Sequence, residues 1–433
     1  MTAASTISPL PKEHIIDLLF NFLRVEEELN PLLCGYFCKM MTAMMNSNKK
    51  PFCLYVFNPR NEVISSMIRH VYNRSIADTL VKILSTDINV SELEEELPNF
   101  MLSDKEQLIK IVTDLVAQIG TQEYEGKLNA AMVLQELYTN SRHLAAATKD
   151  AKMHKLLFAH LSSSDDLTIR SSLTVLITFF QKLPEVYDNN EGGESSKLDY
   201  EIKEDFDNNM GEYATALCDI IEADSTKVIS QQYNSEQVKP FGFTRVQAMK
   251  IFLAIVKEGN ISWTAHFGSL FSNLLKYTQD YPWNSALHKI VEEVFVSIIR
   301  SNSEYDLGSQ TAFLEETNFF AFLAEFEATV EFEDSKRPLR AGNIASINIL
   351  ANILKENLSD ELKKFSVENE LFQAFDTEIL IESNSNNNQP LAGHSTANDE
   401  DDDDSDDNHY ETSMDKLFAT FTQVKETYDS SRS

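Results

Sequence analysis

The sequence predicts an all-α fold, an irregular α-solenoid of the HEAT or armadillo type, on the strength of three observations. Apolar residues recur at steps of three and four along most of the chain, as they do in amphipathic helices. The 433 residues include only 12 glycines and 11 prolines, whereas the many turns of compact β proteins are built from these residues. The interval from Asn129 to Ser171 equals that from Arg245 to Leu287, and it falls within the roughly 40–47 residues of such a repeat.

Six segments carry clear helical patterns, and we expect a helix in each. They are residues 106–119, 129–138, 171–183, 245–257, 287–299 and 344–354. Their apolar stripes are broad, as expected of helices that are packed on two sides. Residue identity between the segments is poor, so a compact helical bundle stays open as the alternative architecture.

Four parts are expected along the chain: a flexible N-terminus, one helical-repeat domain, a disordered acidic linker and a short amphipathic helix. Their bounds are 1–12, 13–381, 382–411 and 412–430, with an acidic loop or partly helical insertion at about 184–209. The linker holds few apolar residues and dense charge of one sign, which predicts disorder. In the last part, apolar residues recur at helical spacing: Met414, Leu417, Phe418, Phe421 and Val424. This helix is expected either to dock on its own array or to enter a partner's groove.

The charge of the chain argues against several classes of function. With 68 acidic and 37 basic residues the formal net charge is −31, whereas nucleic-acid binding needs basic groups that neutralise phosphates. An anionic membrane surface would also repel the chain. No apolar run approaches the roughly 20 residues of a membrane span, and the N-terminus lacks the apolar core of a signal peptide. We therefore expect a cytoplasmic protein, with the nucleus as a second location, and a partner with a basic patch.

Familiar catalytic motifs are absent from the sequence. No G-x-G-x-x-G, H-E-x-x-H or G-x-S-x-G occurs, and the Gly-Asp and Gly-Asn-His elements of metallophosphatase loops are missing too. The nearest approach to a P-loop, Gly120 to Gly126-Lys127, has one residue too many between its glycines. Leu128 also stands where Ser or Thr should bind Mg²⁺. We therefore expect neither an enzyme nor a cofactor.

Residues 22–41 combine three consecutive carboxylates with an apolar run that holds two cysteines. Cys34 and Cys38 would share one helix face, but no second pair completes a zinc site. We expect them to pack in the core, with a metal or redox site as the alternative. Consecutive carboxylates on a helix point in different directions, so Glu26–Glu28 are expected at a solvated helix end. Asn30 is predicted to be the N-cap, and Pro31 the first residue, of a buried helix.

From about residue 15 to about residue 380, six motifs in order resemble the SAPS-domain family of phosphatase-associated proteins. They lie at residues 18–41 with 63–84, and at 128–137, 241–260, 281–295, 313–327 and 337–354. The most characteristic are a Trp-Asn-x-x-Leu-His set that begins at Trp283 and an Arg-x-Gly-Asn element that begins at Arg340. Two departures from the family pattern stand out: Phe241 replaces the usual Leu, and Ser285-Ala286 replaces the usual Asn-Phe.

The resemblance implies a non-catalytic, HEAT-like scaffold that binds the catalytic subunit of protein phosphatase 6 (PP6), a Ser/Thr phosphatase. In animals such scaffolds also bind an ankyrin-repeat third subunit. The candidate partner-binding residues are Trp283, Asn284, His288, Arg340, Gly342 and Asn343. Tryptophan is enriched at interface hot spots. The alternative is that these residues fill the core between repeats and cap its turns.

Three further expectations complete the interpretation. Ser405, among aspartates, resembles an acidophilic-kinase site, although phosphorylation there would only deepen a negative patch. Family members usually carry further residues ahead of the first motif. If that region helps to hold the phosphatase, this chain binds it differently or more weakly. The alternative function is an acidic HEAT-type carrier or adaptor for basic cargo, whose binding would depend steeply on salt.

Overall fold

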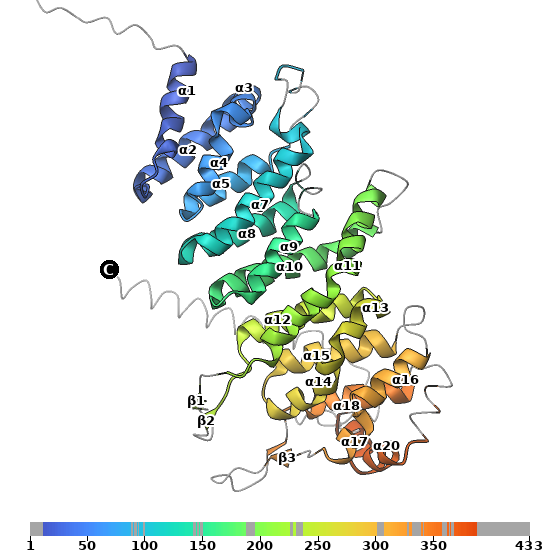
Figure 1. The fold of residues 1–433 in the computed structure, drawn as a ribbon. Helices are drawn as coiled ribbons and strands as arrows, with labels where there is room; N and C mark the ends of the chain where they lie inside the picture. The colour runs from blue at the N-terminus through green and yellow to red at the C-terminus, as the bar shows by residue number, and fades with distance from the viewer. Residues whose placement is uncertain are drawn as a thin grey trace, which may run out of the picture. The chain divides into compact units, whose positions relative to one another are not determined.

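Helices of the unit Met1–Ile381 pack in two rows in a computed structural model of the chain (Figure 1). In the first row each helix packs against the next. These helices are α2 (Pro31–Ser47), α5 (Arg74–Leu84), α8 (Tyr124–Asn140), α10 (Asp166–Tyr187), α12 (Phe243–Lys257), α15 (Ser285–Ile299) and α18 (Ile344–Glu356).

The second row lies against the first, with contacts between α7 and α8, α11 and α12, and α14 and α15. Its helices are α4 (Val63–Arg69), α7 (Lys105–Thr121), α9 (Ala151–Ala159), α11 (Ser195–Glu222), α13 (Ile261–Thr264), α14 (Gly268–Asp280), α16 (Leu307–Glu316), α17 (Phe319–Ala324) and α20 (Glu370–Phe375). A helix of one row followed by a helix of the other is the helical hairpin of an α-solenoid.

Short elements complete the described chain. The helical ones are α1 (Lys12–Phe20), η1 (Asn21–Arg24), α3 (Lys49–Val56), η2 (Pro59–Asn61), η3 (Met101–Ser103), η5 (His160–Ser162), η6 (Ala265–Phe267), the π-helical turn η7 (Asp376–Leu380) and α21 (Ile381–Asn387). Two antiparallel ribbons pair β1 (Ile229–Ser230) with β2 (Gln237–Val238) and β3 (Thr329–Val330) with β4 (Leu339–Arg340). The structure describes residues 12–87, 95–97, 100–141, 150–187, 195–225, 228–230, 237–300, 307–326, 329–330, 339–340, 342–356 and 368–387, with a few single residues between these ranges.

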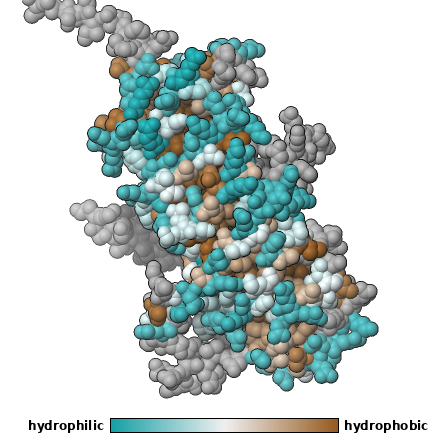
Figure 2. All heavy atoms as spheres, in the orientation of Figure 1, coloured by the Kyte–Doolittle hydropathy of each residue, from teal (hydrophilic) through white to brown (hydrophobic). Residues whose placement is uncertain are grey.

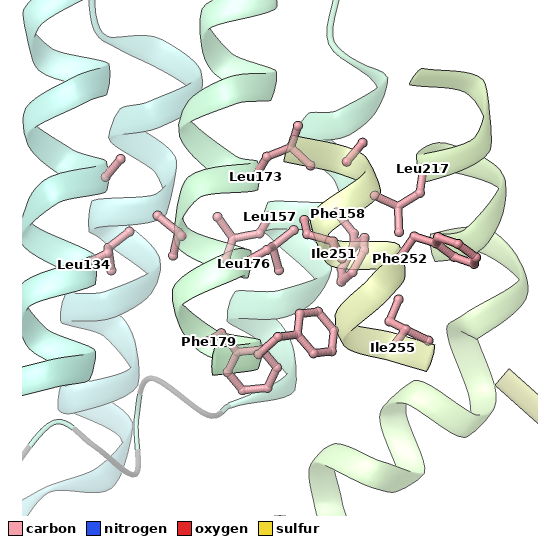
Figure 3. Close-up of a cluster of buried hydrophobic side chains, with 14 of the residues drawn as sticks. Leu134, Leu157, Phe158, Leu173, Leu176, Phe179, Leu217, Ile251, Phe252 and Ile255 are labelled. Carbon is pink, nitrogen blue, oxygen red and sulfur yellow. The ribbon is translucent and has the colours of Figure 1, made fainter. Parts of the chain in front are cut away.

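Apolar side chains from both rows meet in the core between α8 and α12 (Figure 3). Leu134, Leu176 and Phe252 come from the first row, and Leu157 and Leu217 come from the second. All five are fully buried. Burial of such a side chain contributes about 1.5–3 kcal/mol, so the broad apolar stripes of the sequence hold the two rows together.

Asparagine or aspartate begins many of the helices. The Asn30 Oδ1 accepts hydrogen bonds from the backbone N–H groups of Leu32 (3.0 Å) and Leu33 (3.3 Å), with Pro31 as the first helical residue. Asn73 caps α5 in the same way. These bonds satisfy N–H groups that have no partner inside the helix. The predicted N-cap at Asn30 is therefore confirmed.

The predicted fold class is confirmed, and the repeat interval has a structural basis. Each of the six predicted segments lies within a helix: α7, α8, α10, α12, α15 and α18. Asn129 and Ser171 belong to α8 and α10, and Arg245 and Leu287 belong to α12 and α15. Both pairs of helices are neighbours in the first row. The equal intervals therefore mark successive turns of the array.

Three local expectations differ from the structure. The helix that begins at Pro31 is only half buried, because Leu32, Tyr36 and Met40 are at least 50% exposed. Glu26–Glu28 lie in an exposed linker, because the helical turn before them already ends at Arg24. Helix α21 extends from Ile381 to Asn387, so residues 382–387 of the expected disordered linker are helical.

Other expectations concern the acidic segments and the chain ends. Within the acidic stretch 184–209, α10 extends to Tyr187 and α11 begins at Ser195. Residues 1–11 and 388–433 lie outside the described residues, and so do Ser405 and the amphipathic helix expected at 412–430. The face of the molecule in Figure 2 is largely hydrophilic, with hydrophobic residues in separate small groups. None of the described helices combines the length and the apolar character that crossing a bilayer requires.

Candidate partner-binding surface

Asn129, Arg245 and Asn343, three polar residues of the sequence motifs, each donate a hydrogen bond to a backbone carbonyl of a neighbouring hairpin. The Asn129 amide on α8 donates to the carbonyls of Val71 and Tyr72, both at 3.0 Å, just after α4. The Arg245 Nε on α12 donates to the Ile221 carbonyl at the end of α11 (2.6 Å). Each side chain satisfies a carbonyl at or just beyond the C-terminal end of a preceding helix, where the helix itself offers no donor. These residues therefore fasten one helical hairpin to the next.

Asn343, which precedes α18, is the third of these fasteners. Its amide donates to the Thr278 carbonyl in the last turn of α14 (3.0 Å), and the side chain is only 2% exposed. Gly342 packs beside it against the turn before α15, so closely that an added Cβ would lie 2.3 Å from the Pro282 carbonyl oxygen. The same Cβ would lie 2.7 Å from Cε3 of Trp283. The structure thus brings the two candidate motifs, at 283–288 and 340–343, into direct contact.

The Trp-Asn-x-x-Leu-His set builds the turn between α14 and α15. The Asn284 Oδ1 accepts from the Leu287 N–H (3.1 Å) as the N-cap of α15. His288 is buried, and its Nε2 donates to the Tyr281 carbonyl (2.8 Å). Trp283, in contrast, is 47% exposed. Among the candidate residues whose side chains the structure describes, only Trp283 offers a large, exposed apolar surface.

Arg340 belongs to β4, where it pairs with Thr329 of β3. Its side chain lies outside the described residues. In the chain Arg340 precedes by two residues Gly342, which packs against the Trp283 ring.

A buried arginine, Arg245, contacts the turn between α14 and α15 through Tyr281. The sequence did not single it out as a site. The guanidinium carbon of Arg245 lies 4.0 Å from the ring centroid of Phe241, and 5.7 and 5.8 Å from those of Tyr277 and Tyr281. Its Nη1 also donates to the Tyr281 hydroxyl (3.3 Å). A cation held over aromatic faces is attracted by their negative faces. Phe241, one of the departures from the family pattern, thus provides the closest of the three rings. Arg245, which stands at the start of a largely apolar stripe in the segment 245–257, was the available signal.

We call the starts of the first-row helices, with the turns before them, the leading edge. In its N-terminal half the turns are directly connected. The Leu29 N–H donates to the Tyr72 hydroxyl (2.8 Å), which joins the turns before α2 and α5. The Asn129 amide joins α8 to the Tyr72 carbonyl. The Lys127 ammonium pairs with the Asp165 carboxylate (2.7 Å), which joins the starts of α8 and α10.

The C-terminal half of the leading edge is connected as closely. The Thr244 hydroxyl at the start of α12 donates to the Asp166 carboxylate at the start of α10 (2.7 Å). The rings of Phe241 and Tyr281, before α12 and α15, pack edge to face with centroids 5.1 Å apart. Trp283 then contacts the turn before α18 through Gly342. The leading edge is therefore continuous from α2 to α18.

Large apolar side chains are exposed along this edge. They are Leu32, Leu33 and Tyr36 of α2, Tyr124 and Leu128 of α8, Phe243 of α12, and Trp283 before α15. Their exposed fractions range from 42% to 65%. Single exposed apolar residues are common on soluble proteins, but several gathered on one edge indicate an interaction site. The leading edge is therefore the candidate partner-binding surface.

The two cysteines of α2 face the core and not this surface. Cys34 and Cys38 are buried in the face of α2 that packs on the core, and the Cys38 thiol donates to the Ser75 carbonyl (3.2 Å). Burial raises the pKa of both thiols. Their predicted core packing is confirmed. Over the part of the chain that the structure describes, no three His, Cys, Asp or Glu side chains are grouped to hold a metal ion.

The buried His288 makes a pH-dependent contribution that can be measured. Burial lowers its pKa, so below the ordinary value of about 6.5 the unfolded chain binds more protons than the folded chain. The variant His288→Gln can keep the hydrogen bond but does not titrate. We expect the unfolding free energy of the wild type to fall toward that of the variant as the pH falls from about 7.5 to 5.5. The gap should narrow over this range, because only the wild-type chain loses stability through protonation of His288 in its unfolded state. Urea unfolding at three pH values measures it.

The matched control for this experiment is Asn284→Ala, which removes the cap of the same helix without changing a titratable group. Its cost, about 1 kcal/mol for a lost N-cap, should stay constant over this pH range. If the difference in unfolding free energy from wild type changed with pH equally in both variants, the pKa of His288 would be the same in the folded and unfolded chains.

Comparison with protein families supplies the deciding observation. The family model described as SIT4 phosphatase-associated protein (SAPS) matches residues 41–266 and 268–389, which is most of the chain. The chain belongs to the SAPS family. The match includes α5, α8, α12, α15 and α18, and therefore nearly all of the leading edge from α5 onward.

Curated relatives of this SAPS chain are distant. The mouse serine/threonine-protein phosphatase 6 regulatory subunit 1 is 24% identical over 156 residues, which cover 36% of the chain and 17% of the mouse protein. The chicken regulatory subunit 3 is 20% identical over 319 residues, 68% of the chain and 35% of the relative. The Xenopus laevis regulatory subunit 3-B is 25% identical over 156 residues, 36% of the chain and 18% of the relative. The chain thus aligns with about a third or less of the length of these proteins.

Proposed function

We propose that this SAPS protein is a non-catalytic regulatory subunit that binds and targets a PP6-type Ser/Thr phosphatase catalytic subunit. The family match over most of the chain carries this proposal, together with relatives whose names are those of phosphatase 6 regulatory subunits. A stack of helical hairpins presents an extended surface suited to holding a folded partner.

The C-terminal half of the leading edge supports the proposal physically. Phe243 is 62% exposed and Trp283 is 47% exposed. In the chain, Phe243 lies between Phe241 and Arg245, and Trp283 follows Tyr281, so both adjoin the packed cluster of Arg245 and its aromatic neighbours. Aromatic anchors that are already held in place lose little conformational entropy on binding, and they dominate interface energies. We assign the catalytic subunit to this region, with Trp283 as its central contact. Asn284, His288, Gly342 and Asn343 would act by positioning Trp283.

Purification of the tagged full-length chain from its own cells tests the proposal. An interface with an apolar core holds its partner at moderate and at high salt, so a PP6-type catalytic subunit should be retained at both. An ankyrin-repeat protein in the same complex would identify a third subunit. Recovery of basic proteins alone, all lost at high salt, would contradict the proposal and favour the carrier function, because screened charge attraction fails under these conditions.

Replacing Trp283 by alanine is expected to weaken binding of the catalytic subunit by about 30-fold or more, the loss of about 2 kcal/mol typical of a hot spot. The side chain is half exposed, so folding should be little affected. The matched control is Leu156→Ala on α9, which removes a side chain of similar exposure (40%) from the second row. Titration calorimetry with the purified catalytic subunit measures both. Equal affinity of the two variants would place the interface elsewhere.

A further inference from the structure

A hollow of about 560 Å³ opens at the N-terminal half of the leading edge, among the starts of α2, α5 and α8. Its walls include Glu28 and Pro31 before and in α2, Asn73 before α5, and Glu123 and Glu125 at the start of α8. The hollow is far from the Trp283 turn along the row, with α10 and α12 between them. Its wall chemistry is therefore independent of the proposed phosphatase site.

The hollow is negatively charged. Glu28, Glu123 and Glu125 line it, and none of the three forms an ion pair within the described residues. Glu26 and Glu27, which precede Glu28 in the chain, are exposed. Carboxylates gathered on the wall of a concave site focus a negative potential into it. A positively charged group is thus the complementary occupant.

One cation, Arg74, lines the hollow, and Lys127 follows the wall residue Gly126; both are already engaged. The Arg74 guanidinium pairs with the Asp78 carboxylate one turn along α5 (2.9 Å). The Lys127 ammonium, only 12% exposed, lies between the Asp165 carboxylate (2.7 Å) and the Thr168 hydroxyl (2.6 Å). Each cation therefore has its own carboxylate, and among the described residues the three glutamates of the wall have no ion-pair partner.

Exposed apolar side chains flank the hollow on both sides. Leu32 (65% exposed) and Tyr36 (55%) stand on α2, next to Pro31 of the wall. Tyr124 (61%) and Leu128 (42%) stand on α8, within the same turns as Glu123 and Glu125. Two steps between packed helices, of about 8–10 Å each, separate α2 from α8. About six extended residues span this distance.

The hollow is preformed. The Asn129 amide, on its wall, fixes the carbonyls of Val71 and Tyr72, and the Tyr72 hydroxyl fixes the Leu29 N–H. A ligand would therefore find the acidic wall and the apolar flanks already at their bound distance, which lowers the entropic cost of association.

We propose that this hollow binds a basic segment of another polypeptide, in which Lys or Arg is flanked on each side by Leu or an aromatic residue. The cation would lie among Glu28, Glu123 and Glu125, and the apolar residues would pack on Leu32 with Tyr36 and on Tyr124 with Leu128. Charge complementarity selects this occupant over a second copy of the chain, since two molecules of net charge −31 repel each other. The proposal does not depend on phosphatase binding.

A second hollow supplies a matched control. It measures about 590 Å³ and is lined by Asp207, Glu212 and Asp219 on α11 and by His266. Three carboxylates line it, as in the first hollow, but none of the described side chains of α11 is a large, exposed apolar one. If charge alone attracted basic peptides, the two hollows would bind them equally.

The test is a selection from phage that display random peptides of about 12 residues, long enough to span the site at about 3.3 Å per residue. The immobilised target is the full-length wild-type chain. Affinities of selected peptides are then measured by fluorescence anisotropy against three variants: Glu123→Gln/Glu125→Gln, Tyr124→Ala/Leu128→Ala, and the control Glu212→Gln/Asp219→Asn. Thermal unfolding of each variant verifies that these exposed substitutions leave the fold intact.

We expect the selected peptides to share a Lys or Arg between apolar residues, and their affinity to fall about tenfold in each of the first two variants. The control variant should bind as wild type does. Selected peptides without basic residues, or affinity that falls equally in the control variant, would overturn the proposal. So would a dimer in sedimentation that both site variants abolish, because it would identify a second copy as the occupant.

Discussion

Alanine in place of Gly342 is expected to destabilise the C-terminal hairpins by about 3 kcal/mol, as overpacking of a tightly filled site does. The added Cβ would lie 2.3 Å from the Pro282 carbonyl oxygen and 2.7 Å from the Trp283 ring. A backbone oxygen cannot move aside as a flexible side chain can, so the turn before α15 and the start of α18 must separate. The Asn343 bond to Thr278 would be lost with them.

The destabilisation caused by Gly342→Ala should be measured helix by helix, because the hairpins of a helical-repeat protein can unfold separately. Hydrogen exchange of α14, α15 and α18 should accelerate while that of α5 and α8 stays unchanged, and urea unfolding should begin earlier. The matched control is Gly35→Ala in the second turn of α2, where an added Cβ meets nothing within 4 Å. That variant should gain up to about 1 kcal/mol from helix propensity. Unchanged exchange in Gly342→Ala would show that the two motifs do not touch.

Replacing Arg245 by methionine is expected to cost about 3 kcal/mol. The substitution keeps much of the side-chain volume but leaves the Ile221 carbonyl without its donor, a loss of about 1–3 kcal/mol for a buried group. It also removes the cation from the faces of Phe241, Tyr277 and Tyr281, worth about 0.5–2 kcal/mol. Because Tyr281 and Phe241 connect the starts of α15 and α12, the Trp283 turn should loosen as well.

Urea unfolding measures the cost of Arg245→Met for the whole chain. Hydrogen exchange at the C-terminal end of α11, near Ile221, measures its local effect. Phe241→Leu, which restores the usual family residue, should cost only about 1 kcal/mol because one ring is lost and the hydrogen bond to Ile221 remains. Arg74→Met should change stability by less than about 0.5 kcal/mol, since its ion pair is exposed. If Arg245→Met were as mild as Arg74→Met, Arg245 would not hold the hairpins together.

The sequence was sufficient to predict the helices because their physical signals are local. Stripes at 106–119 and 245–257 record packing on two sides, and Asn30 with Pro31 records the start of α2 through backbone hydrogen bonding. The repeat interval was visible as well, because each hairpin must return to the same row. Such features depend on residues near one another in the chain, and a single sequence displays them directly.

The leading edge could not be predicted, since it depends on which helix starts become neighbours. Tyr36 belongs to an apolar run that looks like core, and only the packed array shows that α2 turns this side outward. In the sequence Arg245 is indistinguishable from an exposed charged residue. Only the structure shows that it bonds to the Ile221 carbonyl and lies over the Phe241 ring. Gly342 and Trp283 are well separated in sequence, and nothing local reveals that one packs against the other.

The mass of the complex formed by the purified chain and a purified PP6-type catalytic subunit tests the central claim most directly. It is measured by light scattering after gel filtration at about 0.15 M and about 0.5 M salt. The Debye screening length at the higher salt concentration is about half that at the lower one. A regulatory subunit with an apolar interface predicts one 1:1 complex at both salt concentrations. Two separate proteins at both salts, or a complex found only at the lower salt, would contradict it.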